Sequence, residues 1–184
     1  MAYKKVDFEL RKFKKFDGEF IENIIDYING KVGKNSNVDV IVGCDSQQRR
    51  SHTVYALTIM FYDRMLHKGA HVIYMKIKIR KERDMFSRLM NESLYVLDLG
   101  NWLDDRLLDT INPKYGPNEY DGSFPYRKVQ LHVDINPDYG KNKQNKSHLV
   151  YSSVMGMLCG SGFSVHAKPD SSAASSAADS ILRK

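Results

Sequence analysis

Three apolar runs separated by short connections dominate the first half of the sequence. They occupy residues 38–45, 53–62 and 70–79, and each has the length and the β-branched or aromatic content of a strand. Because the connections are too short for a crossover, we expect the three strands to form an antiparallel meander. The rest of the chain has to extend or cover this meander.

The second half of the chain alternates between helical and strand patterns. We expect a helix over 83–108, a strand over 128–136, a helix over 147–159, a short strand over 163–167 and a last helix over 171–183, with one earlier helix inside 19–30. This order predicts an α/β fold. The sheet would be mixed and five-stranded, with the antiparallel meander as strands 1-2-3, then strands 4 and 5, and helices on both faces.

The length of 184 residues is near that of one domain. We therefore expect a single domain over 1–184, with an N-terminal helical extension over about 1–35 and a long loop over about 109–127. No apolar run approaches the ~20 residues of a membrane helix, and residues 1–15 lack the apolar segment of a secretory signal. Cys44 and Cys159 are far apart, which excludes a disulfide scaffold and a zinc ribbon. We expect a cytoplasmic protein without membrane contact.

Two acidic residues in the first half stand in apolar surroundings. Asp45 closes the run VIVGCD, where it either caps the following turn or serves a site. Glu92 lies within an apolar stripe of the 83–108 helix, where a carboxylate is costly unless it is paired or binds a metal. The alternative for Glu92 is an ion pair with Arg88, one turn earlier.

Two further acids lie near the end of the chain. Asp134 is on the polar row of the 128–136 strand together with His132, on a strand that we expect to be central and covered on both faces. Asp179 lies on the last helix and, taken alone, is typical of a surface position. His132 is expected to be structural, and Cys44, on the opposite face from Asp45, is expected to be a core residue.

Taken together, these four acids fall on the first strand, the long helix, the fourth strand and the last helix. Converging carboxylates cannot all stay ionised without cations between them, and their oxygens suit Mg²⁺ or Mn²⁺. Two such ions ~3.5–4 Å apart hydrolyse phosphodiesters in many enzymes. We expect Asp45, Glu92, Asp134 and Asp179 to form such a two-ion site.

The sequence also resembles the YkuK-type ribonuclease H-like family of bacteria and phages. The resemblance covers about residues 38–184 and is carried by the segments VGCDSQ, NESL, HVDIN, NKS and KPDSSAASSAAD. It implies a ribonuclease H-like fold and a metal-dependent nuclease-type site at Asp45, Glu92, Asp134 and Asp179. It also implies a bacterial cytoplasm or a phage-infected host as the location.

Basic residues supply a second candidate feature, and the net charge of +6 permits an anionic partner. Lys76, Lys78 and Arg80 share one face of the 70–79 strand, and with Arg49 and Lys143 they would contact the phosphates of a nucleic acid. The alternative is a solvated strand face.

The function expected from the sequence is a Mg²⁺- or Mn²⁺-dependent nuclease or phosphodiesterase that acts on DNA, RNA or a hybrid. Two other classes stay open: a non-catalytic nucleic-acid-binding module on the same fold, and a protein-interaction module. Metal binding separates the enzyme from the other two, and salt-dependent nucleic-acid binding separates the binding module from the interaction module.

Overall fold

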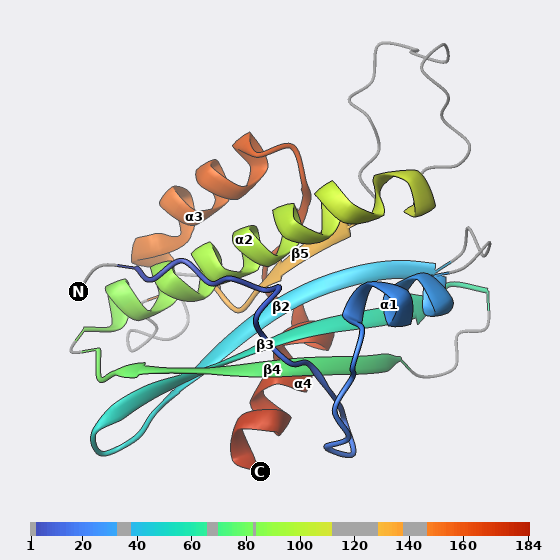
Figure 1. Ribbon diagram of the computed structural model, residues 1–184. Helices are drawn as coiled ribbons and strands as arrows, with labels where there is room; N and C mark the ends of the chain where they lie inside the picture. Colours follow the sequence, from blue (N-terminus) through green and yellow to red (C-terminus); the bar gives the residue numbers. More distant parts are fainter. Residues whose placement is uncertain (1–2, 33–37, 66–69, 83, 112–128, 138–146) are drawn as a thin grey trace.

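The computed structural model describes residues 3–32, 38–65, 70–82, 84–111, 129–137 and 147–184, with the backbone alone for 107–111 and 172–175. The described residues form a six-stranded mixed sheet with the strand order β1-β4-β3-β2-β5-β6. Helices pack on both faces of this sheet (Figure 1). The predicted α/β fold class is confirmed, with one strand more than expected.

The antiparallel half of the sheet is the predicted meander. Its strands are β2 (Val38–Gln48), β3 (His52–Asp63) and β4 (His71–Arg80), and β3 pairs with both neighbours along almost its whole length. The additional strand, β1 (Lys14–Lys15), pairs with the outer edge of β4. Two residues are too few to show an alternating pattern, which is why β1 was not predicted.

The parallel half is built by the two strands of the second half of the chain. β5 (Val129–Val133) runs parallel to β2, and β6 (Ser164–His166) runs parallel to β5. The pairing of β5 with β2 ends at Cys44 and Val133, although β2 continues to Gln48. One edge of β2 therefore extends past the end of β5, and the candidate site lies there.

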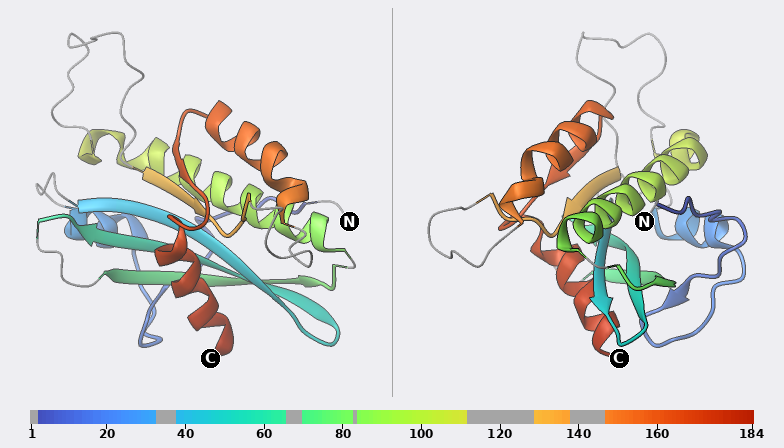
Figure 2. Two further views of the ribbon diagram at one scale, coloured as in Figure 1. Left: turned by 180° about the vertical axis from the view of Figure 1, so that it is seen from behind. Right: turned by 90° about the vertical axis from the view of Figure 1, so that its left-hand side faces the viewer.

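Four helices cover the described sheet. They are α1 (Ile24–Val32), α2 (Met85–Ile111), α3 (His148–Gly160) and α4 (Ser172–Arg183). Figure 2 shows α2 and α3 on one side of the sheet and α4 on the other, and α2 contacts both β2 and β5. None of the helices in these described ranges is long and apolar enough to cross a membrane.

The helix boundaries differ from the predicted ones because capping side chains set them. Asn23 accepts hydrogen bonds from the backbone N–H groups of Ile25 and Asp26, so α1 begins at Ile24, inside the predicted range 19–30, and it continues to Val32. Asp84 accepts one from the N–H of Ser87 at 2.7 Å and starts α2. α2 continues to Ile111, so 109–111 of the predicted loop are helical, and 112–127 lie outside the described residues.

The main core lies between the sheet and α2. Gly100 of α2 packs directly on β5, since a Cβ at this position would stand 2.6 Å from Cδ2 of Leu131. The N-terminal segment covers the other side of α2, where Phe8 and Phe13 contact the ring of Trp102. Close packing on both sides holds α2, and with it Glu92, in a fixed position over the sheet.

Candidate carboxylate site

A pocket of about 360 Å³ opens beside the part of β2 that extends past β5. Three of the four predicted acids, Asp45, Glu92 and Asp134, lie in its wall. They come from β2, α2 and the residue directly after β5. The remaining lining residues are Met85, Arg88, Leu89, Asn136, Ser147 and Lys168.

Asp45 lies within β2 and does not cap the turn, because the strand continues for three residues beyond it. Its Oδ1 accepts a hydrogen bond from the backbone N–H of Ser46 at 2.7 Å. The pKa of Asp45 is raised to about 6, mainly by burial. The negative charges of Asp134 and Asp179 act in the same direction, and the Ser46 hydrogen bond and the charge of Arg88 act in the opposite one. The carboxylate therefore stands in a field of like charge.

Glu92 is the most deeply buried of these acids, with 5% of its surface exposed. Its Oε1 accepts a hydrogen bond from the Ser46 hydroxyl at 2.5 Å. Burial raises the pKa of Glu92 to about 8, although the Ser46 hydrogen bond and the charge of Arg88 act in the opposite direction. Arg88 lines the same pocket and acts on Glu92 through its charge, whereas the hydrogen-bond partner of Glu92 is Ser46.

Asp134 follows directly on the last residue of β5 and forms an ion pair with Lys168. Two hydrogen bonds to backbone carbonyls hold the segment around Lys168 next to the end of β5. The N–H of Lys168 donates to the carbonyl of Ile135 at 3.1 Å, and the Ser171 hydroxyl donates to the carbonyl of Val133 at 2.7 Å. The connection between β6 and α4 is thus tied to the end of β5.

Asp179 of α4 is outside the wall of this pocket. Its side chain is 45% exposed and forms a two-pronged ion pair with Arg183, one turn later, at 2.7 and 3.1 Å. It lies near enough to Asp45 for its charge to raise the pKa of that residue. The structure thus gathers three of the predicted acids at one pocket and leaves the fourth at its margin.

The oxygens of Asp45, Glu92 and Asp134 are the kind that Mg²⁺ and Mn²⁺ prefer. Burial is the main cause of the raised pKa values of Asp45 and Glu92, so ionising these carboxyls is costly unless a positive charge is placed beside them. Across the described ranges, however, no three Asp, Glu, His or Cys side chains are close enough together to hold one ion. The donor chemistry fits a divalent metal, and the carboxylates would have to move closer together to share one ion. One oxygen of Glu92 is bound by Ser46 and one oxygen of Asp134 is paired with Lys168.

A buried hydrogen-bond network that the sequence did not reveal positions the start of α2. Glu82 is almost completely buried and accepts hydrogen bonds from the Tyr55 hydroxyl, at 2.6 Å, and from the side chain of Asn91. The N–H of Glu82 donates to the Thr53 hydroxyl at 3.1 Å. The network fixes Asn91 against β3, and the adjacent Glu92 is thereby aimed at Ser46.

His132 and Cys44 are buried next to the site without lining the pocket. Burial lowers the pKa of His132 to about 4, and its ring packs against His166 at 5.0 Å between centroids. His132 is thus uncharged at neutral pH, as suits the expected structural role. Burial raises the pKa of the Cys44 thiol well above its usual value, and the residue belongs to the core as expected.

The predicted basic residues of β4 are exposed on the face of the sheet that carries α4. Lys76, Lys78 and Arg80 alternate with buried residues and stand in register with Ala56, Val54 and His52 of β3. Ala56 packs against α4 and is itself paired with Asp45, so Asp45, Ala56 and Lys76 form one row across three strands. At 4.7–4.9 Å between strands, the backbones of Asp45 and Lys76 are roughly 10 Å apart.

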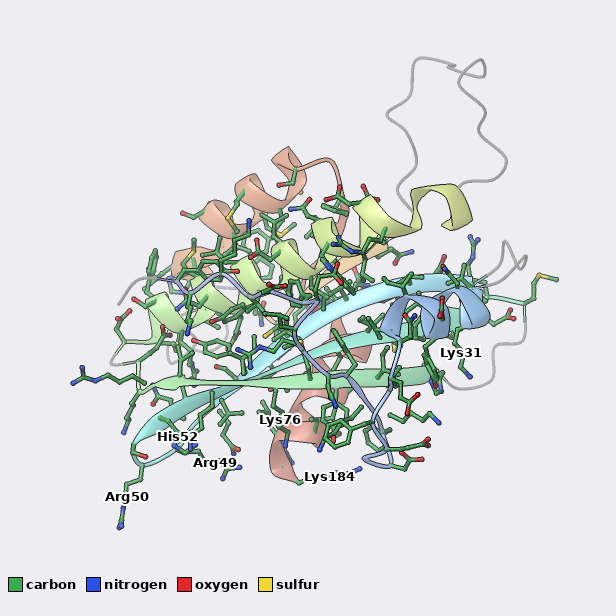
Figure 3. All side chains as sticks on the ribbon, viewed as in Figure 1. Lys31, Arg49, Arg50, His52, Lys76 and Lys184 are labelled. Carbon is green, nitrogen blue, oxygen red and sulfur yellow. The ribbon has the colours of Figure 1, made fainter. Side chains whose placement is uncertain are left out.

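Arg49 and Lys184 extend this exposed basic face, which we call the basic surface and define as Arg49, Lys76, Lys78, Arg80 and Lys184. Arg49 donates to the carbonyl of Leu182 at 2.9 Å, which places it at the end of α4 (Figure 3). The charges of Arg49 and Lys184 lower the pKa of Lys76, after the larger effect of burial. Lys143, also predicted to contact phosphates, lies outside the described residues.

Sequence reasoning missed Lys168, Ser46 and Ser147 as residues of this region. Lys168 stands in the segment KPDSSAASSAAD, yet a single lysine in a connection has no pattern that marks it. Ser46 directly follows Asp45, and strand alternation indicates that it faces the long helix. That alternation, combined with the apolar stripe around Glu92, is the signal that could have paired the two residues.

The fold and this arrangement define a ribonuclease H-like protein, and the comparison of sequences agrees. A family model described as Ribonuclease H-like matches residues 19–183. The chain belongs to this family, which confirms the resemblance seen in the sequence. The matched segment begins before α1, whereas the resemblance was drawn on residues from 38 onwards. No curated protein and no solved structure matches the chain.

Proposed function

We propose that this protein is a metal-dependent nuclease or phosphodiesterase that hydrolyses nucleic acid at the carboxylate pocket. The observation that carries the proposal is the meeting of Asp45, Glu92 and Asp134, from three separate elements, in the wall of one pocket. Membership of the ribonuclease H-like family supports the same chemistry. Fold alone does not fix a function, so the proposal depends on the carboxylates.

Mg²⁺ or Mn²⁺ would supply Lewis-acid stabilisation of the phosphate and an activated water when bound at such a site. Asp45 and Asp134 would hold the first ion, and Glu92 and Asp179 would complete a two-ion site. Asp179 can join the site only if its carboxylate leaves Arg183 and turns towards the pocket. Without Asp179, the site consists of three carboxylates.

The cationic residues of the chain would hold the anionic substrate. Arg88 and Lys168 are in the pocket wall, where they can face a phosphate next to the carboxylates. The basic surface lies on the same sheet face as Asp45, about two strands away, so one nucleic-acid backbone can contact both. Lysine and arginine contacts of this kind position a backbone without selecting its sequence.

Calorimetric titration with Mn²⁺ and Mg²⁺ tests the metal site directly. We expect saturable binding by the wild type, loss of binding in Asp45→Asn, and normal binding in Asp105→Asn, which changes an exposed aspartate elsewhere on α2. Equal binding by Asp45→Asn and wild type would remove Asp45 from the site. A cleavage screen over DNA, RNA and hybrid substrates, with Asp45→Asn as the inactive control, then tests hydrolysis.

A non-catalytic nucleic-acid-binding module is the second candidate, and one observation favours it. Glu92 is bound by Ser46 and Asp134 by Lys168, so these two acids are already partnered within the protein. In this alternative, binding depends on the basic surface alone. It predicts affinity that falls steeply with salt, does not require a divalent metal and is unchanged in Asp45→Asn.

A further inference from the structure

Lys168 is the cationic side chain that forms an ion pair with one of the pocket carboxylates. Its ammonium is paired with Oδ1 of Asp134, and both residues line the pocket that also holds Asp45 and Glu92. The pair is reachable from solvent, with 24% of Asp134 and 45% of Lys168 exposed. Its position is set by the backbone, since the N–H of Lys168 donates to the carbonyl of Ile135.

An ammonium group and a divalent cation make the same demand on a carboxylate. Both seek its lone pairs, and Asp134 cannot give the same oxygen to each at full strength. The charge balance points the same way: Asp45, Glu92 and Asp134 face Arg88 and Lys168 in one pocket. Lys168 therefore neutralises part of the negative charge that would otherwise attract a metal ion.

We propose that Lys168 is a built-in competitor of the metal ion at Asp134, because its ammonium occupies Oδ1 of that carboxylate and its charge opposes that of the ion. This inference rests on the proposed function, because it assumes that Asp134 is a metal ligand. It assigns Lys168 the role of a positioning residue that sets the metal concentration at which the pocket fills. The freed ammonium, still held over the pocket by its backbone contact, would then face the substrate phosphate.

The test is calorimetric titration of Mn²⁺ into four forms of the full chain: wild type, Lys168→Met, Lys168→Arg and Lys31→Met. Methionine keeps most of the length of the side chain and removes its charge. Arginine keeps the charge. Lys31→Met removes the same charge from an exposed site on α1 and so controls for net charge. Circular dichroism confirms folding, which we expect to be retained because the Ile135 contact uses only the backbone of Lys168.

We expect Lys168→Met to bind Mn²⁺ about tenfold more tightly than wild type, since removal of one partly solvated charge next to the ligand has an effect of this order. Lys168→Arg and Lys31→Met should stay within about twofold of wild type. Equal or weaker binding by Lys168→Met would overturn the competition and leave the metal site standing. Equal tightening in Lys31→Met would reduce the competition to an effect of net charge. Failure of wild type and Lys168→Met alike to bind Mn²⁺ would reject the metal site itself.

Discussion

Glu92→Gln should make the protein more stable at neutral pH and remove part of its pH dependence. The Glu92 carboxyl is buried, and its pKa is raised from 4.5 to about 8. Glutamine has nearly the same shape, keeps an oxygen that can accept the Ser46 hydrogen bond and carries no charge. The substitution thus removes the titration while it preserves the contact.

The sign follows from proton binding in the two states. Between the ordinary pKa of 4.5 and the raised value of about 8, the folded protein keeps the proton that the unfolded chain has released. The stability contributed by the protonated group is complete below the lower value and is lost as the pH rises through the upper one. At about 1.36 kcal/mol per pH unit, the wild type loses about 3 kcal/mol from this residue between pH 5.5 and 7.5.

Urea denaturation in the presence of EDTA, at pH 5.5, 6.5 and 7.5, measures this difference. The advantage of Glu92→Gln over wild type should grow by about 3 kcal/mol across the series, while the exposed control Glu22→Gln should follow the wild type. Asp45, whose pKa is also raised, titrates in both proteins, so the comparison reports the Glu92 titration together with its coupling to Asp45. If the free energies of unfolding of Glu92→Gln and wild type changed in parallel with pH, the conclusion that Glu92 is a buried carboxyl without a compensating charge would be refuted.

Three further predictions concern the framework around the site. Gly100→Ala should lower the free energy of unfolding by about 1–3 kcal/mol, because its Cβ would meet Leu131, whereas Gly156→Ala, open in α3, should be neutral or stabilising in the same urea assay. Tyr55→Phe should cost about 1–3 kcal/mol, since it removes a hydrogen bond to the buried Glu82 carboxylate, and urea denaturation again measures it. Arg49→Ala combined with Lys76→Ala should weaken oligonucleotide binding and reduce its salt dependence by about two phosphate contacts. Lys31→Ala, on α1, serves as the control in the same titration. An unchanged salt dependence would exclude the basic surface as the nucleic-acid-binding site.

Most of the elements were predictable because their apolar patterns are long. The meander, the α2 helix and the terminal α4 helix were expected within a few residues of their observed bounds. The order of the strands within the meander was predicted from its short connections and is confirmed. The places of β5 and β6 were not predicted, because periodicity shows that a strand exists and not which strand it pairs with. The position of β5 beside β2 thus came from the structure, and it is this pairing that brings Asp134 to Asp45.

The acids of the site were predictable because each conflicts with its local surroundings. Glu92 interrupts an apolar stripe, and Asp45 ends an apolar run, so both stood out in the sequence. Lys168 conflicts with nothing locally, and only its three-dimensional placement shows that it contacts Asp134. Strand alternation was the one sequence signal that placed Ser46 on the side of Glu92. Asp179 was predicted on the correct helix, but its ion pair with Arg183 was not predicted.

The adjacent residues Asp45 and Ser46 connect the two faces of the sheet. Asp45 stands in register with Ala56, which packs under α4, while Ser46 holds Glu92 of α2 on the other face. Which of the two residues faces which helix depends on the register of β2, because a shift by one residue turns every side chain of the strand to the opposite face. A substitution along β2 keeps this register, whereas a single-residue insertion or deletion between Val38 and Asp45 would exchange the two partners and dismantle the pocket.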